Sequence, residues 1–488
     1  MDRTSVIFGN IIPNKVCKKA IKSQKKYTKK YGDDSKTVYP LCTSKNEVLD
    51  EFIGVQNIEI GAEGGTLHPE KSLIVGNIRM GFGHYRISMA IASAAHSMGY
   101  IPYWFDLNSY SQTTGGKVID KLNSLYSMGS RLSQKSSLFN KFYWEPLNSE
   151  GFKKLSYNAV DQKVAELMTP VYGQLPKEIP FIATHVWPAQ AAVHAGLTRV
   201  VNVIPDNWPM ALHLAEGSIH TVQTPSAFMG YKTLKKMDGD KILKPMPEGS
   251  LEYVGHYIDH ELVSNIEVDC ERRMDRIQNN KALRVLLTVG GAGAQKDFFI
   301  KLIRELIPLV RSKKLALFIN VGDHKNVWEG LERDIPELES ESCKYFDDWN
   351  STKQIAKKAL EQEIHGIHAF YNNDIFAAVY ATNLLMRSTD ILITKPSELA
   401  FYPVPKLMIK RVGGHEAWGA IRAAEVGDGT IECDSIERSI QMLYLMISDK
   451  SFLSMLCDNI IKGKQIGIYD GAYKAVKLAT ASRPAPII

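Results

Sequence analysis

The segment Gly81-Phe82-Gly83-His84 combines two glycines with a histidine, and it connects an apolar strand predicted at residues 73–75 to an amphipathic helix. Glycines at a helix N-terminus let backbone N–H groups approach an anion closely, and the positive end of the helix dipole favours a phosphate there. An unperturbed imidazole titrates near neutral pH, so His84 is a candidate general base. Two glycines are also common in turns that are merely tight, and the full dinucleotide-binding fingerprint is missing. The segment therefore predicts either an anion site with a candidate base or a packing turn.

A second glycine-rich turn occurs in the other half of the chain. It contains Gly290, Gly291 and Gly293, follows a strand predicted at residues 285–289, and leads into an apolar helix through residues 299–307. Its backbone N–H groups would again face a ligand at a helix N-terminus. Because the same order of strand, turn and helix appears twice, we predict two domains of similar build.

The elements that must position these turns alternate between strand and helix patterns. This alternation predicts an α/β fold with two facing, doubly wound, Rossmann-like domains, and a cleft where the carboxyl ends of both parallel sheets meet. The predicted strands cover residues 73–75, 101–105, 180–183, 200–204, 221–223, 285–289, 315–321, 391–394 and 406–409.

A chain of 488 residues exceeds what one hydrophobic core usually serves, which also favours two domains. Residues 1–70 form a predicted lysine-rich extension that ends in a glycine-rich connection. The N-terminal domain spans residues 71–255 and carries an insertion at 108–150, whereas the C-terminal domain spans 256–465. Residues 466–488 are predicted to form a helical tail that returns to the N-terminal domain.

The charge of the chain is modest overall but uneven. The formal net charge is +6, and a basic cluster can contact anionic lipid headgroups, although such a run is more often a solvated helix face. No nucleic-acid-binding module accompanies the cluster, so we predict no nucleic-acid partner. The cluster consists of Lys15, Lys18, Lys19, Lys22, Lys25, Lys26, Lys29 and Lys30.

The cellular compartment follows from what the sequence lacks. The chain has no apolar run of membrane-spanning length and no signal-peptide pattern, which predicts a cytoplasmic protein. Its six cysteines show no paired spacing, so we expect reduced thiols and no zinc site. They are Cys17, Cys42, Cys270, Cys343, Cys433 and Cys457.

Two spaced motifs in the second half carry a family resemblance. Glu398 lies seven residues before the proline of Pro403-Val404-Pro405, and Gly414-His415-Glu416 ends eleven residues after that proline. In these motifs, residues 390–429 resemble the nucleotide-sugar half of family B glycosyltransferases. The likeness is to monogalactosyldiacylglycerol synthases and their relatives, which include the UDP-N-acetylglucosamine transferase of peptidoglycan synthesis.

The resemblance implies a UDP-sugar donor site in the C-terminal domain. Glu398 would accept hydrogen bonds from ribose hydroxyls, while His415 and Glu416 would hold the sugar or the phosphate end. Diphosphate binding would rely on Lys395 and the turn at residues 290–293. The donor-binding residues implied are Gly290, Gly291, Gly293, Lys395, Ser397, Glu398, His415 and Glu416.

Matches to the same family continue in the N-terminal half. His84 corresponds to the histidine that closes the family's Gly-Gly-Gly-His loop, Thr184-His185 resembles its Ser-Thr-His segment, and Asp206 stands where the family carries a Thr-Asp element. The resemblance covers residues 71–465 in scattered blocks. The acceptor side implied consists of Gly81, Phe82, Gly83, Asp106, His185 and Trp208.

The predicted reaction is transfer of a sugar from a UDP-sugar to a diacylglycerol-like lipid acceptor at the membrane surface. His84 is the first candidate for the base, and Asp206 is the second candidate or the group that orients it. Backbone amides would stabilise the departing diphosphate, so we expect an inverting enzyme without a metal or other cofactor. The lysine-rich extension and the aromatic insertion would face an anionic membrane, on the inner face, as a peripheral attachment. The sequence makes no prediction of oligomeric state.

Two departures from the family keep other interpretations open. Arg79 stands where family members often carry an acid before the glycine loop, and Lys395-Pro396-Ser397 lacks their glycine-rich turn. A non-catalytic relative that binds nucleotide or lipid would fit these departures, and a UDP-sugar epimerase would share the fold. Individually, His185 is also typical of a cap, Trp208 of packing, and His213 of a satisfied core histidine.

Overall fold

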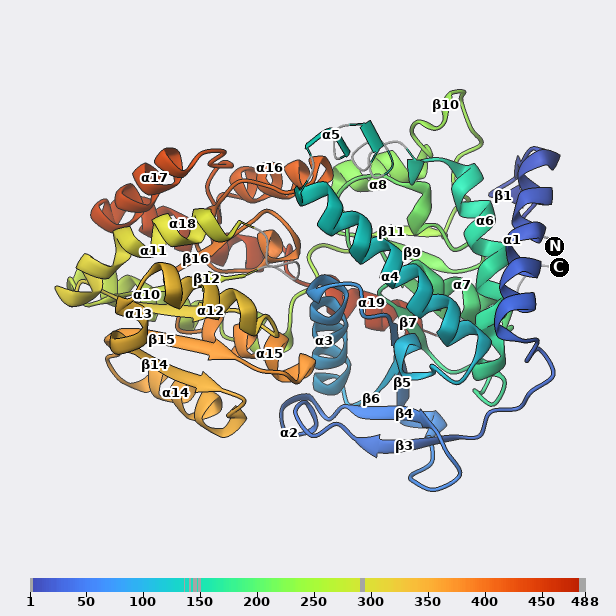
Figure 1. The fold of residues 1–488 in the computed structure, drawn as a ribbon, viewed down its shortest axis with the longest axis horizontal. Helices are drawn as coiled ribbons and strands as arrows, with labels where there is room; N and C mark the ends of the chain where they lie inside the picture. Colours follow the sequence, from blue (N-terminus) through green and yellow to red (C-terminus); the bar gives the residue numbers. More distant parts are fainter. Residues whose placement is uncertain are drawn as a thin grey trace. The chain divides into compact units, whose positions relative to one another are not determined.

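The computed structural model describes residues 3–135, 137–139, 142–143, 147, 151–289 and 295–481. The chain forms two compact units, which Figure 1 shows as a ribbon. Unit 1 contains Met1–Met80, Ile87–Asp259 and Asp470–Ile488. Unit 2 contains Gly81–Arg86 and His260–Tyr469.

Among its described residues, unit 1 has an eight-stranded sheet with the order β11-β9-β8-β7-β5-β6-β4-β3. The pair β3 and β4 is antiparallel, and the other neighbours are parallel. The chain passes from β5 to β6 on one side and then to β7 on the other side of β5, so the winding direction reverses between β5 and β7. The strands are β3 (Leu41–Lys45), β4 (Gln56–Ile60), β5 (Ser72–Asn77), β6 (Ile101–Asp106), β7 (Phe181–Ala183), β8 (Val200–Val203), β9 (Ile219–Val222) and β11 (Leu251–Tyr253).

Helices cover this sheet. Side chains of α4, α6 and α7 join one face of the strands in a single core, in which Val118, Val164 and Val186 accompany Ile74 and Phe181. The helices are α1 (Asn14–Tyr31), α2 (Asp50–Ile53), α3 (Phe82–Ser97), α4 (Thr114–Lys135), α5 (Ser137–Phe139), α6 (Leu155–Ala165), α7 (Val186–His194), α8 (Pro225–Lys232) and α19 (Gly471–Thr480). The start of α3, up to Arg86, is assigned to unit 2. Short strands β1 (Val6–Ile7), β2 (Asn10–Ile11) and β10 (Met237–Asp240) lie outside the large sheet.

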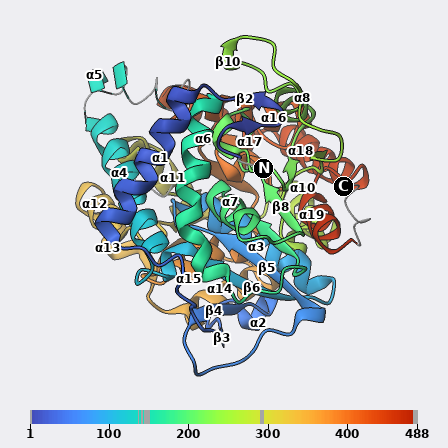
Figure 2. The same ribbon diagram turned by 90° about the vertical axis from the view of Figure 1, so that its right-hand side faces the viewer.

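The N-terminal residues are part of unit 1. Strands β3 and β4 extend its sheet beyond β6, and Tyr110 Oη donates a hydrogen bond to the Ile58 carbonyl at 2.9 Å. Helix α1 packs on α6, as Figure 2 shows, and buries Ala20 on that side. The sequence predicted an extension at residues 1–70. Strands β3 and β4 are short and mostly polar, so they carry little of the hydrophobic pattern by which a domain is predicted.

The C-terminal helix also belongs to unit 1. Helix α19 contacts β7 and β8, and Arg199 Nε donates to the Ala479 carbonyl at 3.1 Å. At its start, the Gly471 amide donates to the His256 carbonyl at 2.9 Å. The end of the chain therefore packs against the sheet of unit 1 rather than that of unit 2.

Asp161 on α6 is a buried carboxyl group of unit 1 that supports a prediction about pH. Trp187 Nε1 donates to it at 3.3 Å, and burial raises the pKa of Asp161 from its ordinary value of 3.8 to about 7. A raised pKa means that the folded protein keeps a proton that the unfolded chain has lost between these pH values. The protonated Asp161 side chain therefore makes its full contribution to the free energy of unfolding below pH 3.8, and this contribution is lost as the pH rises through 7.

We expect Asp161→Asn to remove this pH dependence. A pKa difference of about 3 units corresponds to about 4 kcal/mol of unfolding free energy, which the variant should regain at pH 8 relative to the native chain. Urea unfolding at pH 5 and pH 8 measures the difference. Glu47→Gln, at an exposed carboxylate, is the control and should leave the slope unchanged. Identical pH slopes for the native chain and Asp161→Asn would contradict the assignment.

Unit 2 contains, in its described part, a six-stranded parallel sheet with the order β14-β15-β13-β12-β16-β17. The chain goes from β12 to β13 on one side and later adds β16 on the other side of β12. The winding direction therefore reverses between β12 and β16. The strands are β12 (Leu283–Thr288), β13 (Leu315–Asn320), β14 (Ser342–Phe346), β15 (Gly366–Tyr371), β16 (Ile391–Thr394) and β17 (Lys406–Met408).

The core of unit 2 joins these strands to the flanking helices. Val285 and Leu287 of β12 pack with Phe299 and Ile303 of α11. The helices are α9 (His260–Val263), α10 (Ile266–Gln278), α11 (Lys296–Arg311), α12 (Lys325–Asp334), α13 (Glu337–Glu341), α14 (Trp349–Glu361), α15 (Ile375–Met386), α16 (Ala417–Val426), α17 (Ile436–Ser448) and α18 (Lys450–Gln465).

The predicted α/β fold with two Rossmann-like sheets is confirmed. Strands β14 and β15 were not predicted, because polar residues and a histidine interrupt their apolar pattern. Across the described residues, we find no helix whose length and hydropathy would suit a membrane span.

Candidate functional site

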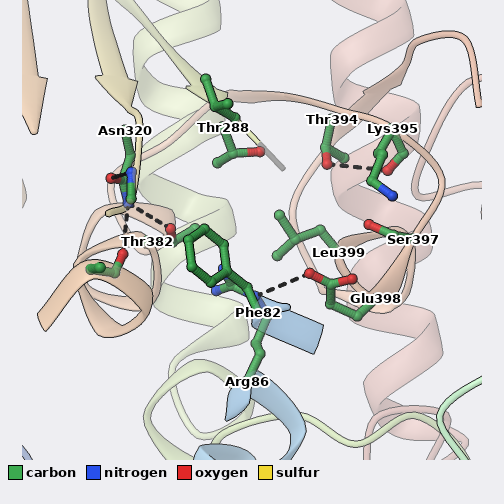
Figure 3. A pocket seen from close by; sticks show the side chains of 13 residues that line it. Phe82, Arg86, Thr288, Asn320, Thr382, Thr394, Lys395, Ser397, Glu398 and Leu399 are labelled. Atoms are coloured by element: carbon green, nitrogen blue, oxygen red, sulfur yellow. Dashed lines mark hydrogen bonds and ion pairs between the residues drawn. The ribbon is translucent and has the colours of Figure 1, made fainter. Parts of the chain in front are cut away.

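A pocket of unit 2 lies where the carboxyl ends of β12, β13 and β16 meet. The winding direction of the sheet reverses there, between β12 and β16, and open α/β sheets bind ligands at this position. Figure 3 shows the side chains that surround the pocket. They belong to Phe82, Arg86, Thr288, Val289, Asn320, Gly322, Ala378, Thr382, Thr394, Lys395, Ser397, Glu398 and Leu399.

The strand ends bring polar groups to this edge. Asn320, at the end of β13, donates through Nδ2 to Thr382 Oγ1 at 2.9 Å and accepts at Oδ1 from the Gly322 amide at 2.9 Å. Gly322 has a positive φ of 62°, and a β-carbon there would lie 2.5 Å from the ring of Phe82. Glycine is therefore required at this turn for both backbone and packing reasons.

Glu398 begins the 3₁₀ helix η7 (Glu398–Phe401) directly after β16 and its turn. Its Oε1 lies 3.7 Å from Arg86 Nε, as Figure 3 shows. On its other side, a β-carbon at Gly83 would lie only 3.3 Å from Oε2. The glycine segment predicted to bind an anion thus lies against a carboxylate of this chain, at the N-terminus of α3, where the helix dipole favours negative charge.

Arg86, which lines the pocket, and its partner Asn383 are among the residues that sequence reasoning missed. The Arg86 side chain is only 3% exposed, and its Nη1 donates to Asn383 Oδ1 at 2.9 Å. The available signal was a single arginine in an otherwise apolar stretch of α3. Its partners are about 300 residues away in sequence, where no local pattern connects them.

Lys395 and Glu416 form an ion pair beside the pocket. Glu416 Oε1 pairs with Lys395 Nζ, and Oε2 accepts from the amides of Val412 at 2.7 Å and Gly413 at 3.2 Å. These contacts fix the end of β16 to the 3₁₀ helix η8 (Gly414–Glu416). Both oxygens of Glu416 therefore have a structural role, and its contact with a sugar stays a prediction.

The turn Lys395-Pro396-Ser397 is compact. The Ser397 amide donates to the Lys395 carbonyl at 2.8 Å. Helix α16 approaches this turn so closely that a β-carbon at Gly419 would lie 2.6 Å from the Pro396 carbonyl oxygen. A glycine in the helix therefore makes this close approach possible.

Gly290, Gly291 and Gly293 lie outside the described residues, and so does the side chain of His415. Their roles stay predictions.

Asp106 and His185 are buried at the carboxyl edge of unit 1, where both act as caps. Asp106 accepts from the Asn108 amide at 2.9 Å, and His185 Nδ1 accepts from the Trp187 amide at 3.2 Å. These bonds begin a 3₁₀ turn and α7, respectively. The capping interpretation of His185 therefore has direct support, and acceptor binding by either residue stays a prediction.

Asp206, just beyond β8, pairs with a histidine of unit 1. His213 Nε2 lies 3.1 Å from Asp206 Oδ2, and the Asp206 side chain is 36% exposed while His213 is buried. Sequence reasoning treated His213 as a core histidine and did not pair it with Asp206. A partly exposed carboxylate oriented by a buried histidine is an arrangement that can accept a proton.

The remaining predicted residues of the acceptor side are divided between the units. Gly81 and the first turn of α3, with the half-buried His84, belong to unit 2, whereas Asp206 and Trp208 belong to unit 1. Lys153 Nζ lies 5.3 Å from the ring centre of Trp208. The proposed orientation of His84 by Asp206 stays a prediction.

Two families with no described function match the chain. Residues 6–233 match "Domain of unknown function (DUF6937)", and residues 246–480 match "Domain of unknown function (DUF6938)". No curated protein matches the sequence.

Several solved structures are similar over most of the chain. UDP-GlcNAc 2-epimerase from Neisseria meningitidis is 11% identical with a TM-score of 0.42, covering 83% of this chain and 99% of its own. A putative UDP-N-acetylglucosamine 2-epimerase from Listeria monocytogenes is 12% identical with a TM-score of 0.45, covering 85% and 98%. The trehalose-phosphate synthase (UDP-forming) from Burkholderia vietnamiensis is 9% identical with a TM-score of 0.41, covering 85% and 98%.

Proposed function

We propose that the protein is a glycosyltransferase that moves a sugar from a UDP-sugar to a diacylglycerol-like lipid. The observation that carries the proposal is the partly exposed carboxylate of Glu398 in a pocket at the reversal point of the unit 2 sheet. An ionised carboxylate accepts two hydroxyl hydrogen bonds, which suits the vicinal diol of a ribose. The spacing of Glu398 to Pro405 and Glu416 supports the same assignment.

In the proposed reaction, one set of residues binds the UDP-sugar and another activates the acceptor hydroxyl. Glu398 and Ser397 hold the nucleoside, and Lys395 with the amides of residues 290–293 neutralises the diphosphate. His84 takes the proton of the acceptor hydroxyl, whose oxygen attacks the anomeric carbon as the bond to UDP breaks. The pair of Asp206 and His213 is the second candidate for that base. Attack opposite the leaving group inverts the anomeric configuration, and no metal or other cofactor is assigned a step.

Release of UDP tests this function. We expect release from one member of a panel of UDP-sugars when diacylglycerol vesicles are present, and much slower release in His84→Ala. Conversion of a UDP-sugar without any acceptor would instead identify an epimerase. Binding of UDP without release on any lipid would identify a non-catalytic relative. Either of these results would overturn the proposed transfer reaction.

An anionic membrane is the surface at which we place this reaction, with the protein cytoplasmic and peripheral. The eight lysines of α1 are all exposed, while the opposite side of the helix packs on α6. Helix α4, which contacts α1 within unit 1, exposes Leu125, Met128 and Leu132 at helical spacing. Lysines beside exposed apolar side chains provide the two signals that reversible membrane attachment needs.

Neutralising half of the lysine face should release the protein from vesicles. We expect Lys18, Lys22, Lys25 and Lys29 together replaced by glutamine to lose about 4 kcal/mol of binding to phosphatidylserine vesicles, or roughly 1,000-fold. Vesicle flotation measures the loss. Replacement of Lys301, Lys314, Lys325 and Lys357, which are exposed in unit 2, is the matched control. Equal flotation of both variants would rule out α1 as the membrane contact.

A further inference from the structure

Arg86 is a buried cation in an apolar part of α3. Its side chain is 3% exposed, and the residues after it, Ile87, Met89 and Ala90, are buried. Removing a guanidinium from water is costly unless acceptors replace the solvent. The partners of Arg86 should therefore reveal why a charge is kept at this position.

Two groups of unit 2 face the guanidinium. Asn383 of α15 accepts from Nη1 at 2.9 Å, which fixes the arginine from one side. Glu398 Oε1 lies 3.7 Å from Nε, and Nε has no hydrogen-bond partner among the described residues. Arg86 is thus anchored by a neutral amide and directed at a carboxylate.

The turn that carries Arg86 is itself held in unit 2. The ring of Phe82 lies 5.6 Å from that of His324, and the ring of Tyr85 lies 5.6 Å from that of Phe376. These aromatic contacts fix the turn on both sides of the glycine at position 83. Arg86 consequently has little freedom to move away from Glu398.

The carboxylate keeps room for a ligand in this arrangement. The Glu398 side chain is 21% exposed and lines the pocket, whereas Arg86 is almost fully covered. Figure 3 shows the two side chains approaching each other at the edge of the pocket. Arg86 therefore contacts the Glu398 carboxylate from its buried side and leaves the side that faces the pocket accessible to a ligand.

We propose that Arg86 is a positioning residue that holds the Glu398 carboxylate for the vicinal diol of a nucleoside diphosphate. This inference rests on the proposed function, because it requires Glu398 to bind ribose hydroxyls. An oriented carboxylate forms stronger hydrogen bonds with two hydroxyls than one that rotates freely. The role concerns the ribose, so it should be separable from diphosphate binding.

Comparing UDP with 2′,3′-dideoxy-UDP tests the role of Arg86 by calorimetry. We expect the native chain to bind UDP at least about 30-fold more tightly than the dideoxy ligand, because two hydrogen bonds to a charged group are lost. In Arg86→Met this preference should fall to about 3-fold or less, with unchanged affinity for the dideoxy ligand. Arg86→Lys keeps the charge without the planar fork and should retain part of the preference.

A second variant of the same contact and a matched control variant accompany Arg86→Met. Asn383→Leu removes the anchor but leaves Arg86 in place, and it should reduce the preference in the same direction. Arg304→Met, at an exposed arginine of unit 2, should leave it unchanged. Thermal unfolding of each variant identifies any that fail to fold.

The possible failures are distinguishable. A native chain that binds both ligands equally would overturn the role of Glu398 and with it the proposed function. A native preference that survives in Arg86→Met and in Asn383→Leu would overturn only the positioning role. Equal weakening of both ligands in Arg86→Met would also overturn it, because Arg86 would then act on the diphosphate or on the fold.

Discussion

Replacing Glu398 by glutamine is expected to lower UDP affinity by about 30-fold or more and to abolish measurable sugar transfer. The amide keeps the size of the side chain but loses the charge, and its nitrogen cannot accept a hydroxyl hydrogen bond. The loss should be larger in transfer than in binding, because a misplaced nucleoside also misplaces the anomeric carbon.

The buried side of Glu398 adds to this effect. Arg86 would lose its counter-charge while remaining almost fully covered, and its Nε would face a neutral amide. The preferred conformation of the side chain at position 398 should therefore change as well. Calorimetry with UDP and a UDP-release assay measure the two effects separately.

Glu437→Gln is the matched control for this substitution. Glu437 is an exposed carboxylate near the start of α17 in the same unit. We expect native affinity and native transfer in that variant. Native UDP affinity in Glu398→Gln would refute the assignment of the donor site to this carboxylate.

The largest effect on stability is expected at the buried pair of Lys406 and Asp428. Their charged atoms lie 2.7 Å apart, with the Lys406 side chain 0% and the Asp428 side chain 1% exposed. Tyr469 Oη donates to Asp428 at 2.7 Å, and Lys406 Nζ also donates to the Tyr402 carbonyl at 2.6 Å. Burial lowers the pKa of Lys406 and raises the pKa of Asp428, although each partner opposes the shift of the other.

Asp428→Ala should lower the free energy of unfolding by about 3–5 kcal/mol, because it leaves a buried ammonium without its carboxylate. The double variant Lys406→Met, Asp428→Leu should lose less than the single variant, since no unpaired charge remains. Urea unfolding measures both. The exposed pair Lys236 and Asp240 supplies the control, and its removal should leave stability unchanged.

A single-variant loss no larger than that of the exposed control would contradict the account of this pair. The pair also lies close in sequence to the candidate site. Lys406 donates to the carbonyl of Tyr402, which directly follows the 3₁₀ helix η7 that Glu398 begins. We therefore expect Asp428→Ala to weaken UDP binding as well as stability.

Most inner strands of each sheet follow from the sequence, with β15 as an exception. Runs such as residues 285–289 and 391–394 are apolar because central parallel strands are covered on both faces, so their pattern is visible without structure. Strands β3, β4 and β14 lie at or near sheet edges and contain partly or fully exposed residues, so their hydrophobic pattern is weak. They were missed for that reason.

The candidate site was predictable only in part. Glu398 stood out through its spacing to later residues, and the glycine segment before α3 through its position after a strand. The contact between that segment and Glu398 was not predictable, because the glycines suggested an external anion rather than a carboxylate of the chain. The partners of Arg86 and Asp206 depend on tertiary packing, which leaves no periodic signal in the sequence.

A crystal structure determined from crystals of the full chain soaked with UDP would test most directly whether Glu398 binds the ribose of the nucleotide. The account predicts uridine density at the carboxyl ends of β12 and β16, with both ribose hydroxyls within hydrogen-bonding distance of the Glu398 carboxylate. Arg86 should remain on the buried side of that carboxylate. Density for UDP at another site, or a ribose whose hydroxyls do not contact Glu398, would contradict it.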